Sequence, residues 1–115
     1  ASRMSKATTE SLRWRNESLD FERQMVLNEL SGMSSNMRTE LNTKRKQLKL
    51  YEENIIPALR NNYKTMQLGY AQNTEELFEL FDAWETLNMT QLEYLDQLQQ
   101  LALLQVELER ILEIK

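Results

Sequence analysis

Carboxylates and methionine thioethers are the groups in this sequence whose spacing could support acid–base catalysis or metal binding. The chain has no Cys and no His, which excludes thiol nucleophiles, disulfides, zinc fingers and histidine-based catalytic sets. Glu52 and Glu53 are adjacent, so on a helix they point about 100° apart and cannot share a substrate. Thioethers can bind copper, and the candidates are Met25, Met33, Met37, Met66 and Met89. Several of them recur at the spacing of a helix–helix contact, where Met commonly fills gaps in the packing. We therefore expect no catalytic residues, no metal site and no cofactor, and the chain is not predicted to be an enzyme.

A second group of carboxylates follows a predicted turn, at Glu75, Glu76, Glu79 and Asp82. If Asn73 is the N-cap of a helix, Glu76 falls at N3, the capping-box position. Acids in a first turn also compensate the helix dipole, which explains Glu75 and Glu76 without any further role. For Glu79 and Asp82, the sequence does not decide between this ordinary role and a functional one.

The elements that hold these residues are predicted to be two long helices. With two Gly and one Pro in 115 residues, the chain has few residues from which to build turns, and its composition favours helix. Gly69 loosens a helix end, and Asn73 tolerates left-handed dihedrals, so one chain reversal is expected there. The predicted fold class is all-α, a long antiparallel helical hairpin of coiled-coil type. Its expected parts are a disordered start or expression remnant, a first helix, a turn and a second helix: residues 1–9, 10–72, 71–74 and 74–115.

Apolar residues recur in steps of three and four along both arms, which is the seam of a coiled coil. Lys44 and Asn62 interrupt the seam, and Pro57 predicts a kink near residues 54–57 with the seam in phase on both sides. The first seam is predicted at Val26, Leu30, Met33, Met37, Leu48, Tyr51, Ile55, Ala58, Met66 and Gly69. The second is predicted at Leu77, Leu80, Trp84, Leu87, Gln91, Tyr94, Leu98, Leu101, Gln105, Leu108 and Leu112. The arms would be rods of roughly 90 Å and 63 Å, leaving about 20 N-terminal residues as an overhang.

Flanking apolar stripes make both faces wider than a two-helix seam requires. We therefore expect further helices to cover them, from a parent chain or from copies of this one, and the isolated hairpin could dimerise. Charge differs between the arms: residues 1–72 carry 12 basic and 8 acidic side chains, hence +4, and residues 73–115 carry 2 and 10, hence −8. This difference favours antiparallel pairing, although exposed ion pairs are individually weak. The one basic cluster, residues 44–49, faces an acidic arm, so no nucleic-acid partner is expected.

The stretch from Tyr51 to Leu112 resembles the second half of TolC-like outer-membrane efflux proteins, closest to their heavy-metal (CusC/CzcC-type) branch. The matching segments are Tyr51-Glu52-Glu53-Asn54-Ile55-Ile56-Pro57-Ala58, Tyr70, Asn73, Leu77-Phe78-Glu79-Leu80-Phe81-Asp82-Ala83, Leu87, Glu93-Tyr94-Leu95 and Leu108-Glu109-Arg110. Two positions depart from the family pattern. Asn73 stands where the family usually has Gly, and Glu75 where some relatives carry a basic residue. The strands that form the membrane barrel of such proteins are not expected in this fragment.

The resemblance implies a passive export conduit in the outer membrane and periplasm of a Gram-negative bacterium. Such proteins are trimers whose paired helices form a periplasmic tunnel, and their hairpin tips dock a periplasmic adaptor that links to an inner-membrane pump. By match, Tyr70, Glu79 and Asp82 would belong to the gating constriction, and Asn73 and Thr74 to the adaptor-docking turn. The membrane would be contacted only through the missing barrel.

Other interpretations of the same residues remain open. Tyr70 at a helix end is often a simple packing residue. A free-standing coiled-coil interaction or scaffold module would show the same hairpin, but it would need no tyrosine and acids at its tip. An amphipathic helix on a membrane surface would have a basic polar face, whereas the second arm is acidic. No run of 18 apolar residues is present.

Overall fold

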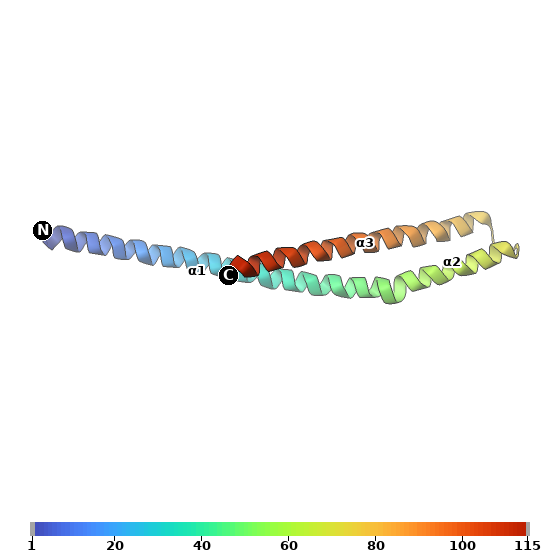
Figure 1. Cartoon of the computed structure of the whole chain (residues 1–115), viewed down its shortest axis with the longest axis horizontal. Helices are drawn as coiled ribbons and strands as arrows, with labels where there is room; N and C mark the ends of the chain where they lie inside the picture. Colours follow the sequence, from blue (N-terminus) through green and yellow to red (C-terminus); the bar gives the residue numbers. More distant parts are fainter. Residues whose placement is uncertain (1, 115) are drawn as a thin grey trace.

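The protein is a single long helical hairpin. The computed structural model describes residues 2–114, in which α1 (Ser2–Leu50), a π-helical segment (Tyr51–Ile55) and α2 (Ile56–Ala71) form one continuous rod. A short connection leads to the returning helix α3 (Leu77–Ile114), as Figure 1 shows. The molecule measures 104 × 20 × 15 Å along its principal axes. The prediction of an all-α antiparallel hairpin is thus confirmed.

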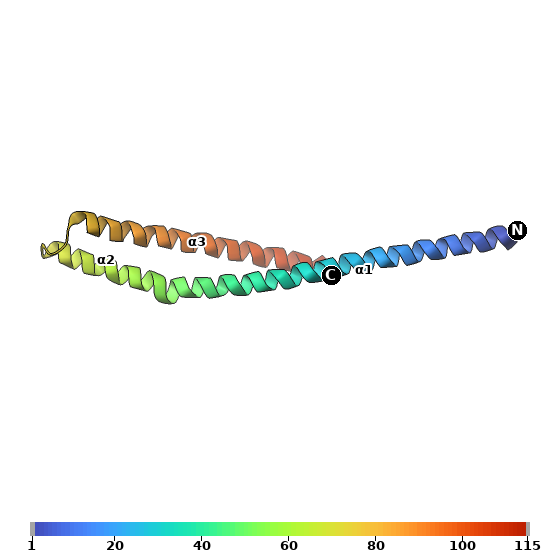
Figure 2. The same cartoon turned by 180° about the vertical axis from the view of Figure 1, so that it is seen from behind.

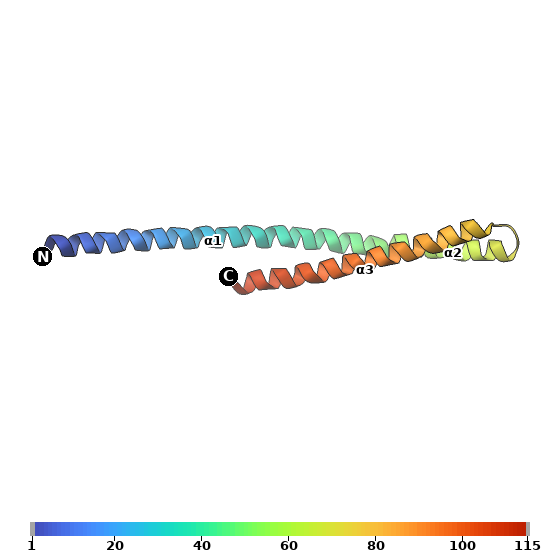
Figure 3. The ribbon, with the colours of Figure 1, turned by 90° about the horizontal axis from the view of Figure 1, so that it is seen from above.

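Helix α3 pairs with α2 and with the second half of α1. Seen from behind and from above, α3 ends beside the middle of α1, and the N-terminal half of α1 extends beyond it (Figures 2 and 3). Every residue from 2 to 26 is exposed, as expected of an overhang. Three predicted bounds differ from the structure. Residues 2–9 are helical rather than a disordered start, with Ala1 outside the described residues. The first rod ends at Ala71 rather than at 72, and the second helix begins at Leu77 rather than at 74.

The rod bends at the π-helical segment just before Pro57, where Figure 1 shows a change of direction between α1 and α2. Proline has no N–H to donate, and its ring would clash with the carbonyl of residue 53 in a regular α-helix. The backbone accommodates the ring with a wider turn, in which the Ile56 N–H donates to the Tyr51 carbonyl. The predicted kink is therefore present, and it takes the form of a π-turn.

The π-turn also shifts the seam by one residue. Before it the half-buried and buried positions include Leu48 and Tyr51, and after it Ile56 and Leu59, so the step across the turn is five residues. Ile55 is 40% exposed, although the sequence predicted it in the seam. The prediction that the seam stays in phase across Pro57 was wrong, because an i→i+5 turn inserts one extra residue into the helical period.

The core between the arms is a narrow line of side chains, which is the geometry of a two-helix pair. Its most buried members are Ser34, Leu41, Leu48, Ile56, Gly69, Ala83, Leu87 and Ile111. On α3, Ala83 and Ile111 occupy the places predicted for Trp84 and Leu112, which are 48% and 41% exposed. The seam of α3 therefore lies about one residue away from the predicted line at both ends.

Two polar contacts fix the register of the arms. The Lys44 Nζ donates to the Oε1 atoms of Gln97 and Gln100, at 2.7 and 2.6 Å, so the cation that interrupts the seam has two acceptors. Farther along, the Tyr94 hydroxyl donates to a Glu52 carboxylate oxygen, and its ring lies 6.1 Å from that of Tyr51. A polar group at a seam position favours the one register in which it finds partners.

Candidate functional site at the hairpin tip

The tip is built on the carbonyl of Gly69. This oxygen accepts hydrogen bonds from the backbone N–H of Thr74 at 2.8 Å and of Glu75 at 3.2 Å, and from the Thr74 hydroxyl at 3.0 Å. Asn73, immediately before these donors, has a φ of 59°, in the left-handed region. A left-handed residue just after a helix lets the chain turn back and satisfy the last carbonyls. The prediction that Asn73 adopts the left-handed conformation at the reversal is confirmed.

Gly69 is required by a close approach rather than by an unusual backbone angle. It is buried within α2, and a Cβ built on it would lie 2.3 Å from the Glu75 Cγ and 3.1 Å from the Glu75 Cβ. The half-buried Glu75 side chain therefore packs directly over the Gly69 backbone. From the sequence, Gly69 was expected to loosen the helix end and to lie in the seam. The structure adds that the returning chain packs directly against its backbone.

The start of α3 differs from the predicted capping box. The first helical hydrogen bond of α3 runs from the Leu80 N–H to the Glu76 carbonyl, at 3.2 Å. Glu76 therefore occupies the N-cap position, and Asn73 belongs to the end of α2 instead. The capping box between Asn73 and Glu76 was a wrong prediction, because three more residues are needed to cross from one rod to the other.

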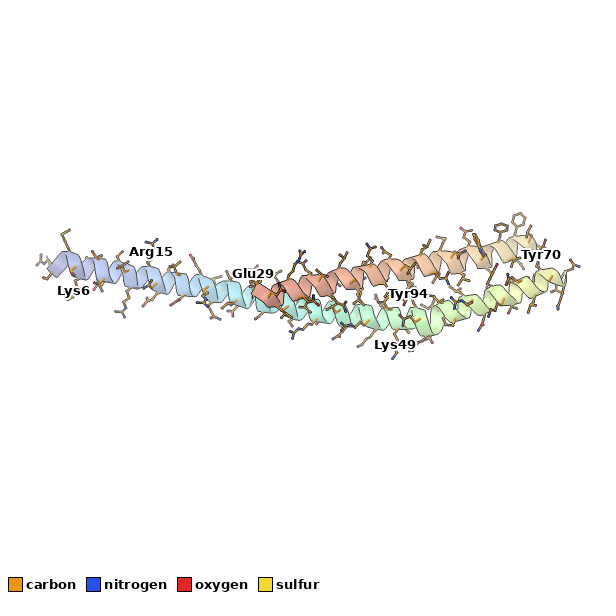
Figure 4. All side chains as sticks on the ribbon, viewed as in Figure 1. Lys6, Arg15, Glu29, Lys49, Tyr70 and Tyr94 are labelled. Atoms are coloured by element: carbon orange, nitrogen blue, oxygen red, sulfur yellow. The ribbon has the colours of Figure 1, made fainter. Side chains whose placement is uncertain are left out.

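The acidic residues of the tip are only partly brought together. Glu79 lies one helical turn after Glu75, and a hydrogen bond with Glu75, followed by repulsion from its charge, raises the pKa of Glu79. Asp82 is exposed one turn further along α3. Tyr70 is 44% exposed at the end of the rod, where Figure 4 labels it, and no contact described for residues 2–114 joins it to Glu79 or Asp82. Within one hairpin, the three predicted gating residues do not form a cluster.

An apolar groove beside the tip is the feature that the sequence did not assign to a site. It has a volume of about 320 Å³ and is lined by Tyr63, Leu77, Leu80, Phe81 and Trp84. Phe81 and Trp84 pack edge to face with ring centroids 6.2 Å apart. The signal in the sequence was the flanking apolar stripe of the second arm, to which Phe81 belongs. Aromatic rings left half exposed in this way commonly mark contact surfaces.

The described residues contain no group of three or more Asp, Glu, His or Cys side chains placed to hold a metal ion. Among helices α1 to α3, none combines the length and apolar character that crossing a bilayer requires. Comparison with known proteins gives no match: no family model, no curated protein and no solved structure is significantly similar to this chain.

Proposed function

We propose that this chain is a hairpin of the tunnel wall of a TolC-like outer-membrane efflux channel, a passive export conduit and not an enzyme. The observation that supports this most is the single reversal at Asn73 between two long rods, preceded by Pro57 and Tyr70 and followed by the acidic start of α3. These are the residues in which the sequence resembles that family. An extent of 104 Å suits a wall element that crosses much of a periplasmic space.

The apolar surface of α3 supports the same proposal. Phe78 is 84% exposed and Leu92 is 66% exposed, so one hairpin leaves large side chains in water. A tunnel wall would cover such side chains by placing hairpins side by side, in the trimer that the resemblance implies. Acidic side chains near the tip, Glu79 and Asp82, would then form a ring at the tunnel mouth that favours cations and repels itself.

The tip is the proposed contact with a periplasmic adaptor, and through it with an inner-membrane pump. Asn73 and Thr74 are exposed on a turn whose backbone is held by Gly69, so a partner's helix end could pack against a preformed surface. In this proposal the protein would lie in the outer membrane and periplasm of a Gram-negative bacterium.

The test uses the parent protein in cells that depend on it for export. Substituting Tyr70→Ala, Asn73→Ala and Asp82→Asn should alter export, tunnel leakiness or cross-linking to the adaptor. Arg15→Ala, on the exposed overhang far from the tip, is the matched control and should change none of them. Unchanged export and docking in all three tip variants would instead favour a free-standing coiled-coil module, the alternative that the hairpin also fits.

A further inference from the structure

The π-turn joins two parts of the rod whose apolar faces have different phases, that is, point in different directions around the rod axis. Before the turn, buried and half-buried residues recur in steps of three and four from Leu27 to Tyr51. A regular helix would continue this line through four positions that are all exposed in the structure: Ile55, Ala58, Asn62 and Thr65. Three of them are small or polar, so this line would make a poor seam in α2.

The face that α2 turns towards α3 lies one residue further along the chain. Its buried and half-buried members are large apolar or aromatic side chains: Ile56, Leu59, Tyr63 and Met66. A helix of regular period would leave this face about 100° away from α3. The extra residue of the π-turn therefore brings the better of two possible faces of α2 into the seam.

Helix α3 has no corresponding break. Opposite this part of the rod, its seam recurs in steps of four, three, four and three: Tyr94, Thr90, Leu87, Ala83 and Leu80. On the rod the steps from Tyr51 are five, three, four and three, and the rings of Tyr51 and Tyr94 lie 6.1 Å apart at the start of both series. Only the step across the π-turn differs, so the turn compensates for one residue that α3 does not have.

Pro57 is compatible with the π-turn but does not select it. The proline ring would clash with the carbonyl of residue 53 in a straight α-helix, and either a kink of regular period or a wider turn relieves that clash. The structure has the wider turn, in which the Ile56 N–H donates to the Tyr51 carbonyl. Only this arrangement lets the large apolar side chains of α2 reach α3.

We propose that the π-turn is a conformational joint whose state is set by the pairing of α2 with α3. The rod has two arrangements, a proline kink of regular period and the π-turn, and contact with α3 selects the second. When α2 separates from α3, the joint returns to the regular period and turns α2 by about 100° relative to α1. Pairing near the tip and the course of the rod are thus coupled. This inference concerns the hairpin itself and does not depend on the proposed transport function.

Deletion of one residue tests whether the extra residue serves the phase of the seam. Asn54 is an exposed member of the π-turn, and its removal leaves Ile56 in step with Tyr51 on a helix of regular period. The equilibrium constant for unfolding, measured by urea denaturation of the full chain, should change by less than about fivefold. Circular dichroism verifies that the variant keeps its helices.

Deletion of Asn61 is the matched control, because Asn61 is also an exposed asparagine but lies in the regular part of α2. It breaks the step between Leu59 and Tyr63, so the seam residues on one side of the deletion lose their places opposite α3. Two large side chains then leave the seam, whichever arrangement the joint adopts. The equilibrium constant for unfolding should rise on the order of a hundredfold, since each side chain contributes about a factor of ten.

Cross-linking reports the phase directly, because the chain has no native cysteine. Met66 and Leu80 occupy corresponding places in the two series of seam residues, whereas Thr65 would face Leu80 only in a rod of regular period. A short bifunctional thiol reagent should bridge Met66→Cys/Leu80→Cys about tenfold faster than Thr65→Cys/Leu80→Cys. The same preference should persist when Pro57→Ala is added, because α3 still selects the phase.

Amide hydrogen exchange tests the coupling between pairing and the joint. Ala83 is 6% exposed in the tip half of the seam, so Ala83→Glu places a charge between α2 and α3. Exchange at residues 51–56 should rise about tenfold, with residues 37–48 of the other half unchanged. Ala102→Glu, at an exposed alanine of the same helix, is the matched control and should change neither.

Three results would overturn the proposal. The first is a loss of stability in the Asn54 deletion as large as in the Asn61 deletion. The second is a preference for the Thr65→Cys pair once Pro57→Ala is present, which would assign the turn to proline alone. The third is unchanged exchange at residues 51–56 in Ala83→Glu while residues 59–66 lose protection.

Discussion

Replacing Gly69 by Ala tests the packing of the hairpin tip. In a regular helix the change normally stabilises, because Ala has the better helix propensity by up to about 1 kcal/mol. At this position the new methyl group would sit 2.3 Å from the Glu75 Cγ, well inside van der Waals contact. The Glu75 Cβ, 3.1 Å away, is fixed by its own backbone, so a rotation of the side chain alone does not create enough space.

The magnitude follows from these two opposing effects. Overpacking of a close contact typically costs about 1–3 kcal/mol, which outweighs the propensity gain. Gly69→Ala should therefore lower the free energy of unfolding by about 1–2 kcal/mol. It should also loosen the turn, because the Thr74 and Glu75 N–H groups must shift away from the Gly69 carbonyl to which they donate.

Gly32→Ala is the matched control. Gly32 is also helical, but nothing lies within 4 Å of where its Cβ would be. It should stabilise the protein by up to about 1 kcal/mol, so the two substitutions should have opposite signs. Urea denaturation followed by circular dichroism measures both, and amide hydrogen exchange of residues 72–76 reports the turn. An increase in stability for Gly69→Ala equal to that for Gly32→Ala would refute the close approach.

Three further predictions concern the inter-arm contacts and the tip. Lys44→Met should leave the free energy of unfolding unchanged or raise it by up to about 1 kcal/mol, because an apolar side chain replaces a cation in the seam. Urea unfolding measures this, and a decrease of more than about 2 kcal/mol in the free energy of unfolding would contradict it. Tyr94→Phe should lower the urea midpoint slightly, because Tyr94 donates a hydrogen bond across the arms. Tyr70→Phe, at a tyrosine for which no such bond is described, is the neutral control. The pKa of Glu79 is raised in the folded protein, so the protonated carboxyl stabilises the fold at pH values below the ordinary carboxyl pKa. This contribution is lost as pH rises through the raised pKa. Glu79→Gln should therefore show a smaller gain in urea midpoint between pH 7 and about pH 4 than the wild type does, and an equal gain would contradict the coupling to Glu75.

The register of the seam depends on how the helix accommodates Pro57, which the residue pattern does not determine. Pro57 predicted a disturbance of the helix, but the sequence could not show that a π-turn would absorb it. A kink and a π-turn relieve the same clash, yet only the π-turn moves the seam from Ile55 to Ile56. The burial of Ala83 in place of Trp84 has a similar origin, because the rotation of α3 depends on how the two rods pack together.

The residue roles proposed for the tip were predicted from a family resemblance, and they stay predictions. The structure shows the local geometry of the tip: Asn73 follows the end of α2, Glu76 occupies the N-cap position of α3, and Glu75 packs over Gly69. These positions do not follow from the order of residues, because a five-residue connection can cross between two rods in several ways. The hydrogen bond between Glu75 and Glu79 does not follow from helical spacing either, because Glu75 lies in the connection before the N-cap of α3.

The sequence by itself determined the fold class, the two rods and the place of reversal, because these depend on local properties: few turn residues, apolar steps of three and four, and an Asn that accepts positive φ. The tertiary structure decided which side chains face the partner arm and which remain exposed. Burial is a property of two helices in contact, and the phase of each depends on the other. Large apolar side chains of α3 such as Phe78 and Leu92 remain exposed because α1 and α2 occupy only its seam.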